Sequence, residues 1–492
     1  MLGSFPGTNV FLGIALSGFL CIPLLVTYAM LASAMPRSGG DYIWVSRILH
    51  PAIGFAGTST GTTIFFMCWM AWNGYNLAAI GYGSALGFIG KLTSSSALAN
   101  IAAWCSGFQG VILISLLSAV VPVLMLVFGM RVFAWLQRGI FVILIAAFAI
   151  FVGILAFSTN ATFIADFNSF FSYIKPDLYH QVINTASVST SFSWTDTLVW
   201  TAFLGVNFMS CWGFAPMLGE VKKAENLKLV TLAIVLPSFA SMIAYALIAW
   251  LMFSVFGQTF LASLGSLMAS GNQLISGMPF QPYWIYLPLL IVPNVFLIVL
   301  FGIVMMSVYV FWVNSTNILP PSRYIFAQSF DRILPKVFGY VHPTRHVPLV
   351  AMAVSAIGGI IWIVWSNFAP SVWIFTAAAA IATIVCQMVP TLVSGIVFPF
   401  RAPEIYKASP CGKYNVAGVP LISIVGLLGL VWALAMTYFY LSIAALGAQV
   451  PVSYYAIVCF FAGGVVLYFV SKWYRTREGF DLSLAFHEIP PL

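Results

Sequence analysis

Long apolar stretches without a charged residue dominate this sequence of 492 residues and limit what it can fold into. A helix rises 1.5 Å per residue, so about 20 apolar residues cross a bilayer. A membrane β-barrel would need apolar and polar residues to alternate in segments of about ten. The stretches here are continuous and far longer, so the sequence predicts an all-α polytopic membrane protein. We predict eleven spans, at about 8–35, 53–89, 108–129, 139–158, 197–218, 229–256, 284–312, 347–366, 371–398, 418–441 and 453–471.

Charged side chains are rare and lie outside the middle of every predicted span. Only 6% of the residues are charged, against roughly a quarter in soluble domains, and all 11 acids and 5 histidines fall in loops or at span ends. Membrane-embedded hydrolases need a nucleophile paired with a base, or metal ligands, within the membrane. The seven cysteines show no spacing typical of a metal or redox site. We therefore expect neither an enzyme nor a bound cofactor.

The basic residues divide unequally when the segments between spans are assigned alternately to the two sides of the membrane. Of 19 Lys and Arg, 17 fall on one side, and only Lys91 and Lys175 fall on the other. Basic residues are retained on the cytoplasmic side, so we predict a multi-pass protein of the cell (plasma) membrane with a cytoplasmic C-terminus. Topology and contact with anionic lipid then explain the net charge of +8 without a nucleic-acid partner. The 17 residues are Arg37, Arg47, Arg131, Arg138, Lys222, Lys223, Lys228, Arg323, Arg332, Lys336, Arg345, Arg401, Lys407, Lys413, Lys472, Arg475 and Arg477.

One predicted span carries residues that interrupt a helix. The uncharged run 197–219 contains Gly213 and Pro216 in its second half. Proline removes an amide donor and clashes with the carbonyl four residues back, so the helix should open near Trp212 and Gly213. Open backbone is tolerated inside a membrane only where it lines a cavity or is packed in protein. The interruption therefore predicts either a binding cavity or a kink that serves helix packing alone.

Neutral polar side chains remain inside the spans. Residues 69, 72, 73 and 76 share one helical face, and Asn207 and Ser210 share another, which leads into the interruption. Such side chains either bind a ligand or hydrogen-bond neighbouring helices, as Asn and Ser do routinely in membrane bundles. The candidate substrate-binding residues are Asn207, Phe208, Ser210, Trp212, Gly213, Phe214, Trp69, Asn73 and Asn76. The candidate ion-binding or inner-gate residues are Ser307, Asn314 and Asn317.

Two long segments connect spans on the side that carries few basic residues. Residues 160–196 are polar, and residues 257–282 are rich in Gly and Ser. Long loops are either functional or merely flexible. These segments are expected to act either as partial lids over an outer vestibule or as ordinary solvated connectors.

Four inner segments resemble, in order, motifs of the amino acid–polyamine–organocation (APC) transporters. Residues 36–42, Pro-Arg-Ser-Gly-Gly-Asp-Tyr, are similar to the family's loop Pro-Arg-Ser-Gly-Gly-(Asp/Glu)-Tyr. Gly129-Met130-Arg131 resembles the loop before its fifth span, and residues 219–226 resemble the segment after its broken sixth span. Ser322-Arg323-Tyr324 with residues 331–336 resembles the loop after its eighth span. The resemblance covers roughly residues 8–470.

This resemblance implies the leucine-transporter fold, with two five-helix repeats of inverted topology and a substrate bound near the midplane against the broken first helix of each. The implied division is a single transporter domain over 1–492, with a first repeat at 8–158, a second repeat at 197–398, two peripheral helices at 418–471 and a cytoplasmic tail at 472–492. Only one span precedes the loop 36–42, where the family has two. We therefore expect that the family's first span is missing through a truncation of about 30–50 residues. The rival reading is a true eleven-span protein.

The resemblance implies a secondary transporter that moves amino acids by alternating access. The alternative is a non-transporting membrane receptor or partner subunit on the same scaffold. The candidate lining is aromatic and uncharged, so a neutral or aromatic amino acid is favoured over a charged one, which would enter without a partner. Proton coupling is less favoured because no titratable group lies at depth, and sodium symport, exchange and uniport rank above it.

The sequence departs from the family's motifs at a few positions. Ser210-Cys211-Trp212 stands where the family often has Gly-x-Glu, and the span 139–158 lacks the lysine that proton-coupled members often carry. Ala224 replaces a proline, and Arg332 replaces a glycine. These departures bear on coupling more than on fold.

Overall fold

The computed structural model describes residues 2–209, 213–369, 374–446 and 451–486, and most of them belong to helices. The first half contains α1 (Val10–Ala34), α2 (Gly40–Ile48), α3 (Pro51–Gly61), η1 (Thr62–Met67), α4 (Cys68–Tyr75), η2 (Asn76–Gly83), α5 (Ser84–Leu92), α6 (Ser96–Ser106), α7 (Phe108–Val127), α8 (Met130–Ala156), α9 (Asn160–Phe170), α10 (Leu178–Ala186), α11 (Trp194–Phe208), η4 (Ala215–Glu220) and α12 (Leu227–Phe256).

The second half continues with α13 (Gln258–Ala269), α14 (Gln273–Ser276), α15 (Leu287–Ile291), α16 (Val295–Ile298), η5 (Val299–Met305), α17 (Met306–Phe330), η6 (Lys336–Gly339), α18 (Leu349–Phe368), α19 (Ile374–Thr383), η8 (Ile384–Met388), α20 (Val389–Arg401), α21 (Pro403–Ala408), η9 (Pro410–Lys413), α22 (Leu421–Ser442), η10 (Ala444–Leu446), α23 (Pro451–Arg477) and η11 (Leu484–Phe486). In the described ranges the strands are β1 (Asn415–Val416) and β2 (Val419–Pro420), which form a small antiparallel hairpin.

Nine helices of the described ranges are long and apolar enough to cross a membrane: Val10–Ala34, Phe108–Val127, Met130–Ala156, Leu227–Phe256, Val295–Phe330, Leu349–Phe368, Ala378–Arg401, Leu421–Ser442 and Tyr454–Arg477. Each of them overlaps one of the predicted spans. The other two predicted spans, 53–89 and 197–218, fall on helical segments that are not single regular α-helices. The all-α polytopic fold is thus confirmed, and the count of eleven spans and the division into repeats stay predictions.

The span predicted at 53–89 is a continuous helical segment from α3 to α5 with two π-helical stretches, η1 and η2. A π-helix has hydrogen bonds from residue i to i+5, so each stretch shifts the helical face that follows it, and such stretches are frequent at functional sites. The candidate Asn76 begins the second stretch.

The prediction for the span at 284–312 was wrong at both ends. α15 ends at Ile291, and the long helix begins at Val295 after Pro293, with the Asn294 side chain accepting a hydrogen bond from the amide of Phe296 at 2.8 Å. Asparagine is one of the residue types preferred at the N-cap, so Asn294 determines that the helix starts at Val295. The helix then runs to Phe330, because its polar inner end packs against other helices and does not need to be apolar.

The span predicted at 139–158 also starts earlier than expected, because α8 begins at Met130. Arg131 and Arg138 end the uncharged run in the sequence, yet both lie within the helix. Arginine side chains have long apolar stems and can reach the membrane surface from within a helix. A charge therefore marked the end of the apolar run and not the end of the helix.

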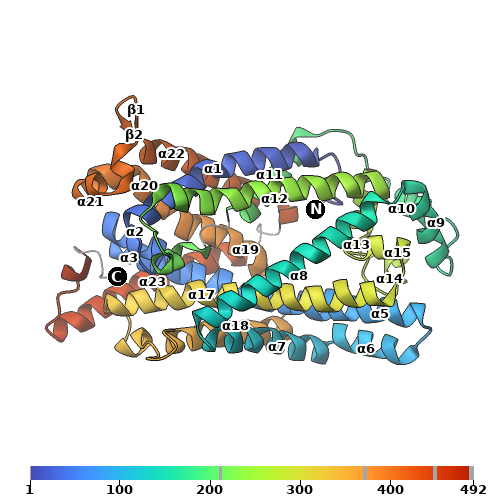
Figure 1. The fold of residues 1–492 in the computed structure, drawn as a ribbon, viewed down its shortest axis with the longest axis horizontal. Coiled ribbons are helices and arrows are strands. Elements are labelled where there is room, and N and C mark those ends of the chain that lie inside the picture. Colours follow the sequence, from blue (N-terminus) through green and yellow to red (C-terminus); the bar gives the residue numbers. More distant parts are fainter. Residues whose placement is uncertain (1, 210–212, 370–373, 447–450, 487–492) are drawn as a thin grey trace.

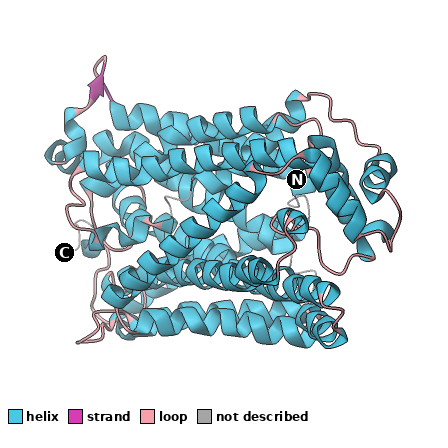
Figure 2. Ribbon diagram, turned by 45° about the vertical axis from the view of Figure 1, so that its right-hand side comes forward, coloured by secondary structure: helices cyan, strands magenta, loops and turns pink. Residues whose placement is uncertain are grey.

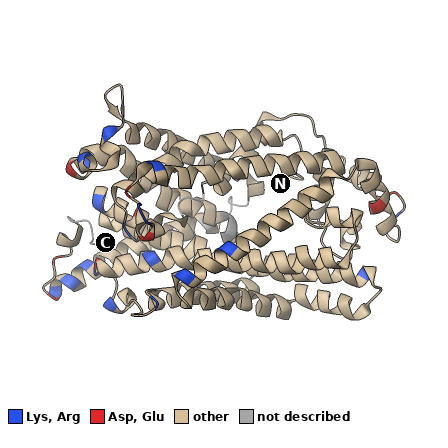
Figure 3. Cartoon of the chain, viewed as in Figure 1, with Lys and Arg blue, Asp and Glu red and all other residues tan. Residues whose placement is uncertain are grey.

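The long helices lie side by side in a bundle, with α1, α11 and α12 along one side and α7, α17 and α18 along the other, and α8 crosses between them (Figure 1). The turned view shows the same bundle, with loops confined mainly to its two ends (Figure 2). Lys and Arg gather at the end of the bundle where α23 ends (Figure 3). We call this end the basic end.

The two long segments at the opposite end are folded. They contain α9, α10, α13 and α14, and buried rings such as Phe163, Phe167 and Phe260 pack together there, with Phe163 and Phe260 centroids 5.5 Å apart. This packing argues against flexible connectors, and a role as partial lids stays a prediction.

Candidate functional site

The interruption predicted in the span 197–218 is present. α11 ends at Phe208, and the chain resumes as the 3-10 helix η4 at Ala215. The helix therefore ends a few residues before Gly213. The candidates Ser210 and Trp212 lie outside the described residues.

The residues on either side of the interruption include an amide side chain and an aromatic ring. A Cβ atom added to Gly213 would meet no atom of the described residues within 4 Å. The Asn207 side chain is exposed, and the Phe214 side chain is 50% exposed. Phe208 is buried, with its ring centroid 5.7 Å from that of Tyr245. Asn207 and Phe214 are thus exposed and Gly213 is partly exposed, whereas Phe208 is buried beside Tyr245, and their role in substrate binding stays a prediction.

One of the two amide side chains predicted to bind substrate on the second span, Asn73, takes part in helix packing. Asn73 is buried, and its Nδ2 donates to Oδ1 of Asn314 at 2.9 Å. Asn314 in turn donates from its Nδ2 to the carbonyl and the Oγ of Ser118, at 2.9 and 3.1 Å. This network joins α4, α17 and α7, so it favours interhelical hydrogen bonding for Asn73 and Asn314 over ligand binding.

The other candidates on these helices differ in their surroundings. The Trp69 ring stacks on Phe65 at 5.4 Å, and its Nε1 is buried without a hydrogen-bond partner in the described part of the chain. Asn76 is partly exposed. Trp69 therefore keeps a free donor, which a ligand group could satisfy.

The three ion-site candidates do not share their neighbours. Ser307 donates to the carbonyl of Ile303 at 2.6 Å and lies 2.8 Å from the hydroxyl of Tyr82. Asn317 is buried, and its Nδ2 has no partner among the described residues. Since Asn314 bonds to Asn73 and Ser118, the structure does not bring these three side chains together as one site.

The segment 36–47, which includes most of α2, lies against η4, the inner half of the interrupted span. The amide of Gly39 donates to the carbonyl of Pro216 at 2.9 Å. Gly40 has φ +39°, and a Cβ there would lie 2.4 Å from the carbonyl of Ala215. A Cβ on Gly219 would lie 2.4 Å from the amide nitrogen of Ser38. Glycine is required at these positions because the two backbones are in direct contact.

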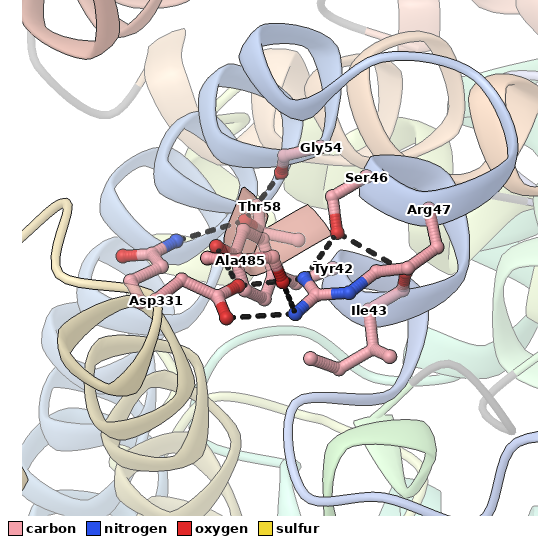
Figure 4. Close-up of polar contacts among 9 residues, drawn as sticks. Tyr42, Ile43, Ser46, Arg47, Gly54, Thr58, Asp331 and Ala485 are labelled. Carbon is pink, nitrogen blue, oxygen red and sulfur yellow. Dashed lines mark hydrogen bonds and ion pairs between the residues drawn. The ribbon is translucent and has the colours of Figure 1, made fainter. Parts of the chain in front are cut away.

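Two ion pairs join this segment and η4 to α17 and its C-terminal end at the basic end. Arg47 donates to both carboxylate oxygens of Asp331, at 2.6 and 2.7 Å, and the Tyr42 hydroxyl donates to the same carboxylate at 2.6 Å (Figure 4). Arg323 on α17 donates to both oxygens of Glu220 in η4, at 2.7 and 3.0 Å. We call these two ion pairs and the contact between Gly39 and Pro216 the basic-end latch. It joins α2 to the end of α17, and α17 to η4.

A buried acid beside the latch was not among the predicted site residues. Asp41 is fully buried, accepts hydrogen bonds from the Tyr324 hydroxyl and from Gln387 Nε2, the latter at 2.6 Å, and forms no ion pair within the described ranges. Burial raises the pKa of the Asp41 carboxyl to about 7, and the hydrogen bonds from Tyr324 and Gln387 oppose that rise. The sequence placed Asp41 in a loop, and only its place in the motif at 36–42 signalled importance.

The structure therefore defines a polytopic helical membrane protein with an interrupted span and with ion pairs that join the helices at its basic end. The family model for amino acid permeases matches residues 1–463. The chain belongs to the amino acid permease family, which lies within the APC superfamily, and this supports amino acid transport as its activity. No curated protein matches the chain.

Proposed function

We propose that this permease carries neutral or aromatic amino acids across the cell membrane by alternating access, with the substrate held against the interruption at Gly213. The observation that carries this proposal is the end of α11 at Phe208, before Gly213, where an added Cβ would meet no described residue within 4 Å. An amino acid is a zwitterion, so backbone amides can hold its carboxylate and backbone carbonyls its ammonium group. No buried counter-charge is then needed.

The surroundings of Gly213 support a neutral side chain. Phe214 is half-exposed at the interruption, and on α4 the buried indole N–H of Trp69 has no hydrogen-bond partner among the described residues. Removing a charged side chain from water without an ionic partner costs several kcal/mol. A lysine, arginine or glutamate substrate would pay this cost, and a phenylalanine or leucine substrate would not.

The basic-end latch supports an alternating mechanism with the basic end in the cytoplasm. It fastens α2 and α17 around η4, the inner half of the interrupted span. In this proposal the latch closes the cytoplasmic path, and its ion pairs separate when the substrate leaves. Side chains that pair in only one of two states can set the balance between those states.

Uptake of labelled amino acids into proteoliposomes tests the proposal. We expect saturable uptake of a neutral or aromatic amino acid, with weaker competition from lysine, arginine and glutamate. Better competition by any of these three would refute the substrate class. Binding without uptake would refute transport and favour a receptor. Imposed sodium and proton gradients, and internal counter-substrate, then distinguish symport with either ion from exchange and uniport.

A further inference from the structure

A cavity of about 510 Å³ lies at the basic end, away from the interrupted span. It forms where the segment after α17 meets the end of α23. Its lining consists of Arg332, Pro335, Lys336, Tyr474, Arg475, Glu478 and Phe480. Neither the interruption nor the latch uses these side chains.

The cavity carries an excess of positive charge. Three of its lining side chains are cationic and one is a carboxylate, which leaves a net charge of +2. Arg475 pairs with that carboxylate, Glu478, at 2.6 Å. Arg332 and Lys336 form no ion pair in the part of the chain that the structure describes. Two cations are thus available to a ligand.

Arg332 is held in a backbone conformation that side chains rarely adopt. Its φ is +61°, in the left-handed region where glycine would fit without strain. Contacts fix it there, because its guanidinium lies 3.6 Å from the Phe480 ring centroid and its carbonyl accepts a hydrogen bond from Arg475 Nε at 2.9 Å. Strained residues that the surrounding structure holds in place cluster at ligand sites.

The cavity also lies at the end of a membrane-spanning helix. Tyr454–Arg477 is apolar enough to cross the bilayer, and Tyr474 and Arg475 belong to its last turn. Trp473 and Tyr474 are 56% and 55% exposed. Exposed Trp and Tyr side chains mark the level of the lipid headgroups. The ligand best placed to reach two unpaired cations at this level is a lipid phosphate.

We propose that this cavity binds the phosphate group of an anionic phospholipid, with Arg332 and Lys336 as its main contacts. Basic pockets beside transmembrane helices on the cytoplasmic side bind such headgroups. Asp331, which pairs with Arg47 in the latch, directly precedes Arg332 in the chain. A bound lipid therefore holds the segment that carries the latch carboxylate. This inference depends on the membrane position of α23 and not on the transported substrate.

Thermal unfolding of the full chain in nanodiscs tests this site. A ligand that binds only the folded state raises Tm. We expect a higher Tm in phosphatidylglycerol than in phosphatidylcholine for the unchanged chain and for Lys413→Gln, a control that removes an exposed basic-end charge outside the cavity. The difference should fall by about half or more in Lys336→Gln and Arg332→Gly.

Arg332→Gly separates binding from folding. Glycine relieves the strain at φ +61°, so this variant should unfold in phosphatidylcholine at a Tm close to that of the unchanged chain while it loses the gain from phosphatidylglycerol. If phosphatidylglycerol raised the Tm of both cavity variants as much as it raised the Tm of the control Lys413→Gln, the proposal would be overturned. If millimolar inorganic phosphate in detergent raised the Tm of the unchanged chain as much as phosphatidylglycerol does, the site would bind free phosphate and the lipid assignment would be overturned.

Discussion

Replacing Asp331 by asparagine should open the basic-end latch. The side chains of Arg47 and Asp331 are only 3% and 5% exposed, so the variant leaves a guanidinium buried without its counter-charge. Removing one partner of a buried ion pair costs ~3–5 kcal/mol. In the proposed mechanism the latch forms only while the basic end is closed, so this cost falls on the closed state. A tenfold change in an equilibrium constant corresponds to about 1.4 kcal/mol. The equilibrium between the closed and open states therefore shifts toward the open state by about 10²-fold or more.

A single reporter cysteine measures this shift. Ser322 is fully buried in this structure, and Ser322→Cys in a chain whose seven natural cysteines are replaced by serine should react slowly with a maleimide. Asp331→Asn should raise that rate by about two orders of magnitude, in line with the population shift. Arg47→Met in the same chain should reverse much of the increase, because it removes the unpaired charge.

The control for this experiment is an exposed ion pair. Asp177 pairs with His180, and both side chains are more than half exposed, so Asp177→Asn should leave the labelling rate unchanged. A rate for Asp331→Asn within about twofold of the parent, in protein that remains folded, would refute the assignment of this pair to the closed state.

Two further predictions follow from buried polar groups. Asn314→Ala should lower the free energy of unfolding by ~1–3 kcal/mol, since it leaves Asn73 without its acceptor, and it should leave KM unchanged in uptake assays. A large KM change with unchanged stability would favour a binding role instead. Asp41 lies in α2, between two spans, and its pKa rises from the usual 3.8 to about 7 on burial. The folded state therefore holds a proton that the unfolded state releases, so stability should fall as pH rises from about 4 to about 7. Asp41→Asn should abolish that slope, which denaturation at several pH values can measure.

The sequence could predict the helical class and the interruption because both depend on local chemistry. Long uncharged runs require spans, and Gly213 with Pro216 requires a break in one of them. The polar end of the helix from Val295 to Phe330 was harder to predict, because packing and not apolar character sustains it.

Partners across the bundle could not be predicted. Helical spacing placed Asn73 on a face, yet it could not show that Asn314, 241 residues later, would meet it. Asp41 contacts Gln387, 346 residues away, and so became buried although its own segment reads as a loop. Burial of this kind depends on tertiary packing, which no local pattern encodes.

Uptake by two variants at position 213 tests the central claim most directly. A Cβ at Gly213 meets no atom within 4 Å in the part of the chain that the structure describes, so Gly213→Ala should transport a neutral amino acid nearly as well as the unchanged chain. Gly213→Leu should fold in the membrane yet abolish uptake, because its branched side chain fills the space and favours a closed helical turn. Wild-type uptake by Gly213→Leu would contradict the assignment of the substrate site to the interruption.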